Sequence, residues 1–261
     1  RLQGDWSSDV CSSDLLENHG EKVRTLNLSG LKAFDITALL EYCPNITSLI
    51  VNEFSLPDNF LTDLTSHRQA QKITALNLAE NSIGNEGVLL IAKNMPHLES
   101  LNLSCNKVNN RGAAIIARKL PRLKHLNLYL NRLTAEALEY LSKRMPSLKC
   151  LSFSCDNMTL QAIQTLIENI PDLERLSLPA SKIQSEEAIT IARGLPNLTH
   201  LDLSINEVDQ YGIEAIANSL LQLVELILIA NNMRREAAPF LRDLRNRGAN
   251  VILSRSFERF L

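Results

Sequence analysis

The chain has 261 residues, of which 45% are hydrophobic, 21% charged and 5% aromatic, and its formal net charge at pH 7 is −2. This neutral balance argues against a protein that binds nucleic acid without sequence preference, because such binding needs a basic surface that displaces counterions from phosphates. No apolar run approaches the roughly 18 residues that a membrane-spanning helix requires, so the sequence predicts no membrane span.

Residues 1–15 do not fit the pattern of the rest of the chain. Residues 5–15, DWSSDVCSSDL, resemble one reading frame of a common sequencing adapter, and residues 1–4 fit its flank and index. We treat residues 1–15 as an artefact and leave them out of the fold prediction. A native N-terminal cap, signal peptide or domain is then expected to be missing. The alternative is a Ser/Asp-rich disordered leader. Without residues 1–15 the net charge is 0, because one arginine and three aspartates are removed.

A period of 25 residues runs through the remaining chain. The motif reads I-x-x-L-x-L-x-x-N-x-I from residue 73 and L-x-x-L-x-L-x-x-N-x-V from residue 98. Its central leucine recurs as Leu76, Leu101, Leu126, Leu151, Leu176, Leu201 and Leu226. Less regular units precede this run at 23–28 and 46–51, and a last strand is expected at 251–253. A strict period of this size predicts a solenoid of stacked units rather than a globule with one central core.

Residues 98–122 show how one repeat is expected to fold. The leucines of LESLNL alternate with polar residues, which predicts a short strand with its leucines pointing into the solenoid. Asn106 follows this strand, and its amide is expected to satisfy backbone groups at the bend. An apolar stripe at i, i+3, i+4 and i+7 from Ala113 predicts a helix, which Pro121 ends.

Equivalent positions recur in the other repeats. The asparagine column continues at Asn81, Asn131, Asn206 and Asn231, with Asp156 and Ser181 as substitutes. Helix N-caps are expected at Thr134, Thr159, Ser185 and Asp209.

The pattern L-x-x-L-x-L-x-x-N-x-φ followed by G/A-x-x-φ-A-x-x-L-P, complete at 98–121, resembles the leucine-rich repeat family. The resemblance covers residues 23–253. It implies an α/β fold: a right-handed solenoid or horseshoe with parallel strands on the concave face and helices on the convex face. The domain is expected to span residues 16–261 in about nine to ten repeats, with a C-terminal cap near 251–261 that contains Phe257, Phe260 and Leu261.

The subfamily stays open. The helical convex side is similar to the class of ribonuclease inhibitor, Ran GTPase-activating proteins and NOD-like receptors. The 25-residue period is nearer the F-box type and the Gala-type repeats of bacterial effectors, although the F-box type carries cysteine where asparagine fills most of the column here.

Candidate binding residues are the large side chains that break the small, polar pattern of the concave face, since binding hot spots favour large aromatic and arginine side chains. One group lies on a single strand and contains His125, Asn127, Tyr129 and Leu130. A second spans three successive strands and contains Arg175, His200, Asp202 and Glu225, with Ile205, Ile227 and Ile229 beside them. The alternative interpretation of the second group is a solvated ladder of opposite charges across strands.

The sequence predicts neither a catalytic nor a metal site. His200 and Asp202 lie ~6.6 Å apart along a strand, too far for a direct hydrogen bond without side-chain reach. His125 and His200 are three repeats apart, roughly 14 Å, which excludes a shared metal ion. No glycine-rich phosphate loop is present. We therefore expect a protein that is not an enzyme and has no cofactor.

An arginine-rich segment ends the chain. Between residues 234 and 259 its charges sum to +4. The arginines are Arg234, Arg235, Arg242, Arg245, Arg247, Arg255 and Arg259. An acidic partner could dock there, and the alternative is the solvated face of a capping helix.

Cysteines and glycosylation sequons bear on the compartment. Cys105 and Cys155 are expected about 9–10 Å apart across two strand spacings, beyond the roughly 7 Å limit for a disulfide, which indicates free thiols and a reducing compartment. Two of the N-x-S/T sequons, at Asn27 and Asn102, fall within strands, where a glycan would block the sheet. We therefore expect a cytoplasmic protein, or one in the host cytosol if it is a secreted effector.

Together these observations predict a non-enzymatic, monomeric module that binds an unidentified protein partner through its concave face. Neither nucleic acid nor a membrane is expected as a partner. One alternative is the substrate-receptor or effector arm of a larger protein truncated at its N-terminus. Another is a Ran-type GTPase-activating protein, for which no catalytic motif is matched. A third is a purely structural spacer.

Overall fold

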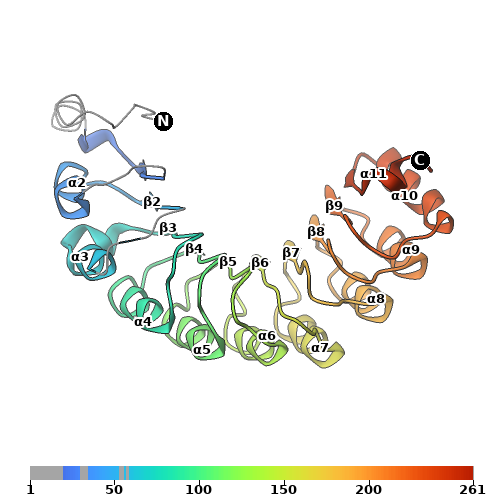
Figure 1. Cartoon of the computed structure of the whole chain (residues 1–261), viewed down its shortest axis with the longest axis horizontal. Helices are drawn as coiled ribbons and strands as arrows, with labels where there is room; N and C mark the ends of the chain where they lie inside the picture. Colours follow the sequence, from blue (N-terminus) through green and yellow to red (C-terminus); the bar gives the residue numbers. More distant parts are fainter. Residues whose placement is uncertain (1–19, 30–34, 53–55, 57–58, 261) are drawn as a thin grey trace. The chain divides into compact units, whose positions relative to one another are not determined.

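The computed structural model of the chain describes residues 20–29, 35–52, 56 and 59–260. The adapter-like residues 1–15 and the predicted cap residue Leu261 lie outside this described part. The chain forms two compact units, which divide between Leu123 and Lys124, and we call them unit 1 and unit 2 (Figure 1).

In the described part of unit 1, four parallel strands alternate with helices, and each strand pairs in register with the next along the chain. The strands are β1 (Thr25–Asn27), β2 (Ser48–Ile50), β3 (Ala75–Asn77) and β4 (Ser100–Asn102). The α-helices are α2 (Ile36–Tyr42), α3 (Phe60–Ser66), α4 (Asn85–Asn94) and α5 (Asn110–Lys119). Short 3-10 helices are η1 (Gly20–Lys22) and η2 (Arg68–Lys72).

The described part of unit 2 repeats the same arrangement with six parallel strands (Figure 1). The strands are β5 (His125–Asn127), β6 (Cys150–Ser152), β7 (Arg175–Ser177), β8 (His200–Asp202), β9 (Glu225–Ile227) and β10 (Asn250–Ile252). The helices are α6 (Ala135–Ser142), α7 (Leu160–Asn169), α8 (Ser185–Gly194), α9 (Gln210–Ser219), η3 (Arg235–Ala237), α10 (Ala238–Asn246) and α11 (Arg255–Glu258).

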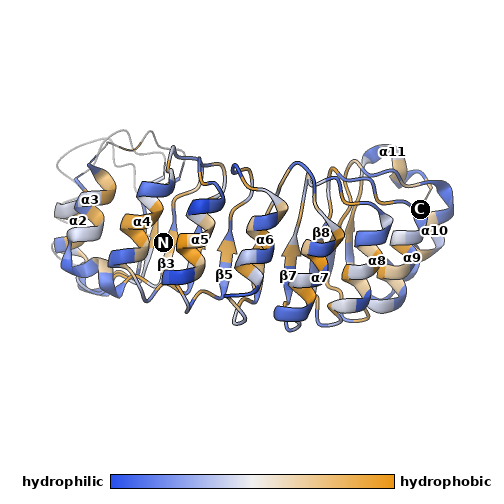
Figure 2. Ribbon diagram, turned by 90° about the horizontal axis from the view of Figure 1, so that it is seen from below, coloured by the Kyte–Doolittle hydropathy of each residue, from blue (hydrophilic) through white to orange (hydrophobic). Residues whose placement is uncertain are grey.

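The core of each unit lies between its layer of strands and its layer of helices. Leu101 is 1% exposed and Leu151 is 2% exposed, and both are flanked by half-exposed residues of the same strand. This alternation confirms the period of two predicted for the strands. Orange and blue segments alternate along the helices in Figure 2, as expected where one face of a helix is buried. Burying one such leucine stabilises the fold by about 1.5–3 kcal/mol.

Asn106, which follows β4, connects its repeat to the preceding one. Nδ2 of Asn106 donates to the carbonyl of Leu78 at 2.9 Å, and its Oδ1 accepts the N–H of Ile83 at 2.8 Å. The prediction that Asn106 satisfies backbone groups at the bend is therefore confirmed. The two substitutes behave differently. Ser181 is buried and its hydroxyl accepts the N–H of Cys155 at 3.3 Å, whereas Asp156 is exposed.

Helix N-caps agree with the predictions in part. The side chains of Thr159 and Asp209 accept backbone N–H groups of the helices that follow them. The prediction for Ser185 was wrong, because the N-cap of α8 is Gln184, which forms a capping box with Glu187. Ser185 is the first residue of α8, and its hydroxyl donates instead to the carboxylate of Asp209 in the next repeat.

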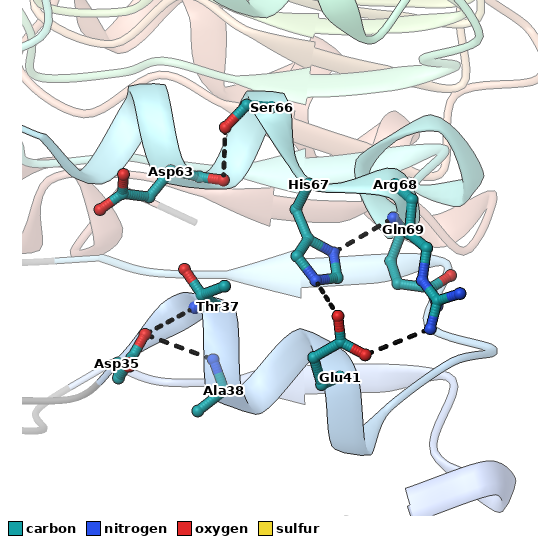
Figure 3. A network of polar contacts seen from close by, with 9 residues as sticks. All are labelled: Asp35, Thr37, Ala38, Glu41, Asp63, Ser66, His67, Arg68 and Gln69. Atoms are coloured by element: carbon teal, nitrogen blue, oxygen red, sulfur yellow. Dashed lines mark hydrogen bonds and ion pairs between the residues drawn. The ribbon is translucent and has the colours of Figure 1, made fainter.

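A polar network connects α2 to η2 within unit 1 (Figure 3). The backbone N–H of Gln69 donates to Nδ1 of His67 at 3.2 Å. Because Nδ1 is then an acceptor, the ring proton lies on Nε2, which donates to Oε1 of Glu41 at 3.1 Å. Arg68 donates to the other oxygen of Glu41 at 3.2 Å. The hydrogen bond from His67 and then the charge of Arg68 lower the pKa of Glu41 below its ordinary value of 4.5.

Candidate protein-binding face

The outward side chains of β5 to β10 form the strand face of unit 2, on which all the predicted site residues lie. The strand register arranges them in two rows across the strands. The first row contains His125, Cys150, Arg175, His200, Glu225 and Asn250. The second row contains Asn127, Ser152, Ser177, Asp202, Ile227 and Ile252. Tyr129, Leu130, Ile205 and Ile229 follow the ends of their strands.

The structure brings the second predicted group together and keeps it apart from the first. Arg175, His200 and Glu225 are direct register partners on β7, β8 and β9. The first group lies on β5, separated from β7 by strand β6, whose first-row residue is Cys150. The continuous part of the candidate site is therefore the β7–β9 region.

Electrostatics in the first row centre on His200. Its partial burial lowers the pKa of the imidazole below 6.5, and the charge of Arg175 lowers this pKa further, while Glu225 raises it. Nδ1 of His200 lies 2.9 Å from the hydroxyl of Thr199. A lowered pKa favours the neutral ring at pH 7, so the positive charge in the middle of this row belongs to Arg175.

Arg175 is exposed and makes no ion pair with any other residue in the described ranges. Its neighbour Glu174 instead pairs with Lys149 at 3.4 Å. Glu225, on the opposite side of His200, accepts a hydrogen bond from Nδ2 of Asn250 at 3.1 Å. The guanidinium of Arg175 therefore has its full hydrogen-bonding and charge capacity available to a partner.

Two of the predicted residues use their polar atoms locally. Oδ1 of Asn127 accepts the N–H of Tyr129 at 3.0 Å. Oδ1 of Asp202 accepts both the N–H and the hydroxyl of Ser204, at 2.9 and 2.6 Å, and its Oδ2 accepts the hydroxyl of Ser177 at 3.0 Å. These bonds hold the turn after each strand, so Asn127 and Asp202 have less capacity left for a partner than their exposure on the strand face suggests.

Large apolar side chains are exposed where the strands of this face end. Leu130 is 50% exposed, Ile205 55% and Ile229 42%. The N–H of Ile205 donates to the carbonyl of Ile229 at 2.7 Å, so these two isoleucines lie on adjacent chains. Ile227, in the second row, is half-buried. The β8–β9 end of the strand face is thus apolar, beside the charged first row.

Leu221 and Val224 are 71% and 53% exposed and were not among the predicted site residues. They precede β9, at the opposite end of the strand from Ile229. A signal was present, because Leu221 replaces the proline of the repeat and Val224 stands where other repeats have Glu99, Lys124, Lys149, Glu174 and Thr199.

Across the described ranges, no group of three or more His, Cys, Asp or Glu side chains is placed to hold a metal ion. Burial raises the pKa of Cys150 and Cys155, so these thiols are not activated as nucleophiles. Within that same part of the chain, no helix has the length and apolar character needed to cross a bilayer.

The arginine-rich segment is largely occupied by contacts within the C-terminal cap. Arg245 pairs with Glu258 at 2.7 Å and Arg247 with Asp243 at 2.9 Å. Arg235 and Arg259 lie over the ring of Phe260, and Arg242 donates to its backbone carbonyl. Phe260 in turn contacts the buried Phe257 edge-on. These contacts favour the capping interpretation over an acidic docking site.

Comparison with known proteins agrees with this repeat architecture. A family model described as a leucine-rich repeat matches residues 69–92, 94–117 and 194–217. These three segments of the chain are similar to leucine-rich repeats. Among solved structures, an internalin from Listeria monocytogenes superposes with a TM-score of 0.52 and 17% sequence identity, covering 90% of this chain and 88% of the internalin chain. At this identity the likeness shows the leucine-rich repeat fold alone. A search of curated proteins gave no match.

Proposed function

We propose that this chain is a non-enzymatic leucine-rich repeat scaffold that binds a protein partner on the strand face of unit 2. The observation that carries the proposal is the β7–β9 region. There an unpaired arginine, a neutral histidine and exposed isoleucines interrupt a surface of otherwise small polar side chains. Arginine and large side chains dominate the energetics of protein interfaces.

We further infer that the module works in the cytoplasm as a monomer. Its cysteines at 43, 105, 150 and 155 are all free thiols, which suits a reducing compartment. The helical layer opposite the strands supports the ribonuclease-inhibitor-like class, although the 25-residue period is shorter than is usual there.

Charge reversal on the strand face tests the proposal. We expect the double variant Arg175→Glu, Glu225→Lys to lose affinity-captured partners that the wild-type chain retains, because it removes charge complementarity at the centre of the face. Thermal unfolding is expected to change little, since Arg175 is exposed and Glu225 is half-exposed. The matched control is Glu168→Lys, Arg193→Glu on the exposed side of α7 and α8. Equal capture by all three chains would contradict the proposal.

A further inference from the structure

We propose that Arg175 and His200 together bind a carboxylate of the protein partner, and that His200 takes up a proton when this carboxylate binds. This inference rests on the proposed function and specifies the chemistry of the partner. Its support is the register of β7 and β8, the hydrogen bonds of Thr199, and the atoms of the two side chains that these bonds leave available.

The hydrogen bonds of Thr199 determine which ring nitrogen of His200 carries the proton. The hydroxyl of Thr199 donates its one proton to the carbonyl of Glu174 at 3.0 Å. Nδ1 of His200 lies 2.9 Å from the same hydroxyl oxygen, which is then left as an acceptor. In the neutral ring the proton therefore lies on Nδ1, and Nε2 carries a lone pair.

Two other repeats support this direction of the threonine bond. Thr47 and Thr74 stand at the same repeat position, and their hydroxyls donate to the equivalent carbonyls, at 3.2 and 3.4 Å. Neither threonine is followed by a histidine. The threonine therefore donates to the carbonyl whether or not an imidazole is beside it.

Arg175 and His200 are placed to bind one group between them. They are register partners on adjacent parallel strands, which lie ~4.8 Å apart. In the part of the chain that the structure describes, Arg175 makes no ion pair and Nε2 of His200 makes no hydrogen bond. The two oxygens of a carboxylate can accept from a guanidinium and from a protonated imidazole at once, and such charge-assisted bonds are the strong ones.

Binding and protonation are linked because the carboxylate fits only the protonated ring. Neutral His200 presents the lone pair of Nε2, which repels a carboxylate. In the free chain, partial burial and then the charge of Arg175 lower the pKa of His200. A bound carboxylate offsets that charge and gives Nε2–H an acceptor, so it raises this pKa. The partner is therefore expected to bind more tightly as pH falls from the bound-state to the free-state pKa of His200.

The other charged groups around His200 are consistent with proton uptake. Glu225, its register partner on β9, raises its pKa. Asp202 lies two residues further along β8 and on the same face. Glu174 and Lys149 pair with each other and cancel in charge. Glu225 and Asp202 stabilise the imidazolium, and they also repel a partner carboxylate as long as His200 stays neutral.

Acetate and its neutral isostere acetamide are the probes for this subsite. The measurement is the NMR titration midpoint of His200 in the full chain, at constant ionic strength. We expect about 0.5 M sodium acetate to raise the midpoint by about 0.3 pH unit relative to sodium chloride, the shift that linkage gives when acetate occupies about half of the protonated molecules. Acetamide should not shift it. Equal midpoints in acetate and chloride would overturn the inference.

Variants assign the acetate shift to Arg175. We expect Arg175→Gln to abolish the shift, because the guanidinium supplies part of the subsite. Arg193→Gln is the matched control, since Arg193 is exposed on α8, and it should keep the shift. A shift that persists in full in Arg175→Gln would mean that acetate acts on His200 without Arg175, contrary to the inference.

The tautomer of His200 is tested separately. Above the midpoint, long-range proton–nitrogen spectra should show the proton of His200 on Nδ1, whereas that of His67 lies on Nε2. Thr199→Val should give a mixture of tautomers at His200, and Thr199→Ser should restore the Nδ1 form. A proton on Nε2 of wild-type His200 would contradict the inference, because the neutral ring could then donate to a carboxylate without taking up a proton.

The outcomes separate this inference from the proposed function. Capture of partners should strengthen from neutral to mildly acidic pH, and His200→Gln should remove this pH dependence. If capture depends on Arg175 and Glu225 but acetate does not shift the midpoint of His200, the strand face binds proteins and the carboxylate subsite is wrong. If capture does not depend on Arg175 and Glu225 and acetate has no effect, both are wrong.

Discussion

Asn206 joins two consecutive repeats through one side-chain amide. Its Nδ2 group donates to three backbone carbonyls and its Oδ1 accepts two backbone N–H groups. These partners belong to Leu178, Ser181, Ile183, Leu203 and Ser204. These five backbone groups lie at a buried bend, where neither a strand nor a helix can supply their hydrogen bonds. The side-chain amide of Asn206 supplies these bonds instead.

Removing this amide should be costly. We expect Asn206→Ala to lower the free energy of unfolding of unit 2 by about 3 kcal/mol or more, since each buried polar group left unpaired costs about 1–3 kcal/mol. The shift of the urea midpoint measures it. Asp156→Ala is the matched control, because Asp156 stands in the same column but is exposed. Similar shifts for the two variants would show that the hydrogen bonds of Asn206 do not account for its contribution to stability.

The titration of His200 reports the electrostatics of the strand face. We expect its NMR midpoint below 6.5, because burial and then Arg175 lower its pKa. Arg175→Gln should raise the midpoint and Glu225→Gln should lower it further, while Arg193→Gln on α8 should leave it unchanged. Since the folded-state pKa is depressed, the contribution of His200 to stability is present above pH 6.5 and is lost as pH falls through its folded pKa. An unchanged midpoint in Arg175→Gln would show that Arg175 does not contribute to the pKa of His200.

At the scale of elements, consecutive repeats are also connected by side chains on their helices. In unit 1 the bond from His67 and the charge of Arg68 hold Glu41 in its ionised form, so that α2 is tied to η2. A carboxylate with a depressed pKa contributes stability above its unfolded-state pKa, and this contribution is lost as pH falls through the folded-state value.

Glu41→Gln should therefore destabilise unit 1 in a pH-dependent way. At neutral pH the variant loses the ion pair, and we expect amides of α2 and η2 to exchange hydrogen faster than in the wild type. As pH falls through the folded-state pKa of Glu41, which lies below the ordinary value of 4.5, the wild type loses the same charge and the difference should shrink. Glu168→Gln, an exposed residue of α7, serves as the control. A difference that persists unchanged at low pH would show that the charge of Glu41 does not contribute.

Elements could be predicted from the sequence where the 25-residue period specifies them. Leu101 and Asn106 recur at fixed positions, so their burial and bonding followed from the repeat. The N-cap of α8 did not, because Gln184 is a poor capping residue by type and acts through its capping box with Glu187. The alignment of Arg175, His200 and Glu225 also followed from the period. The exposure of Ile205 did not, since an isoleucine in sequence suggests a buried strand residue.

At the scale of the whole molecule, the fold depends on contacts between neighbouring repeats. Within unit 2 each strand pairs with the strands directly before and after it in sequence. The stability of such an array is approximately a sum of repeat and nearest-neighbour terms. A defect in one repeat is therefore expected to spread to adjacent repeats and to weaken with distance along the chain.

Leu151→Asp tests this locality. Leu151 is 2% exposed at the centre of β6, and a carboxylate there is buried without a partner, which is among the most destabilising kinds of substitution. We expect hydrogen exchange to show lost protection in β5, β6 and β7, while β9 and the strands of unit 1 stay protected. Ser152→Asp is the matched control, since the side chain of this adjacent residue is half-exposed on the strand face and should tolerate the charge. Loss of protection throughout the chain in Leu151→Asp would instead require cooperativity that extends well beyond neighbouring repeats.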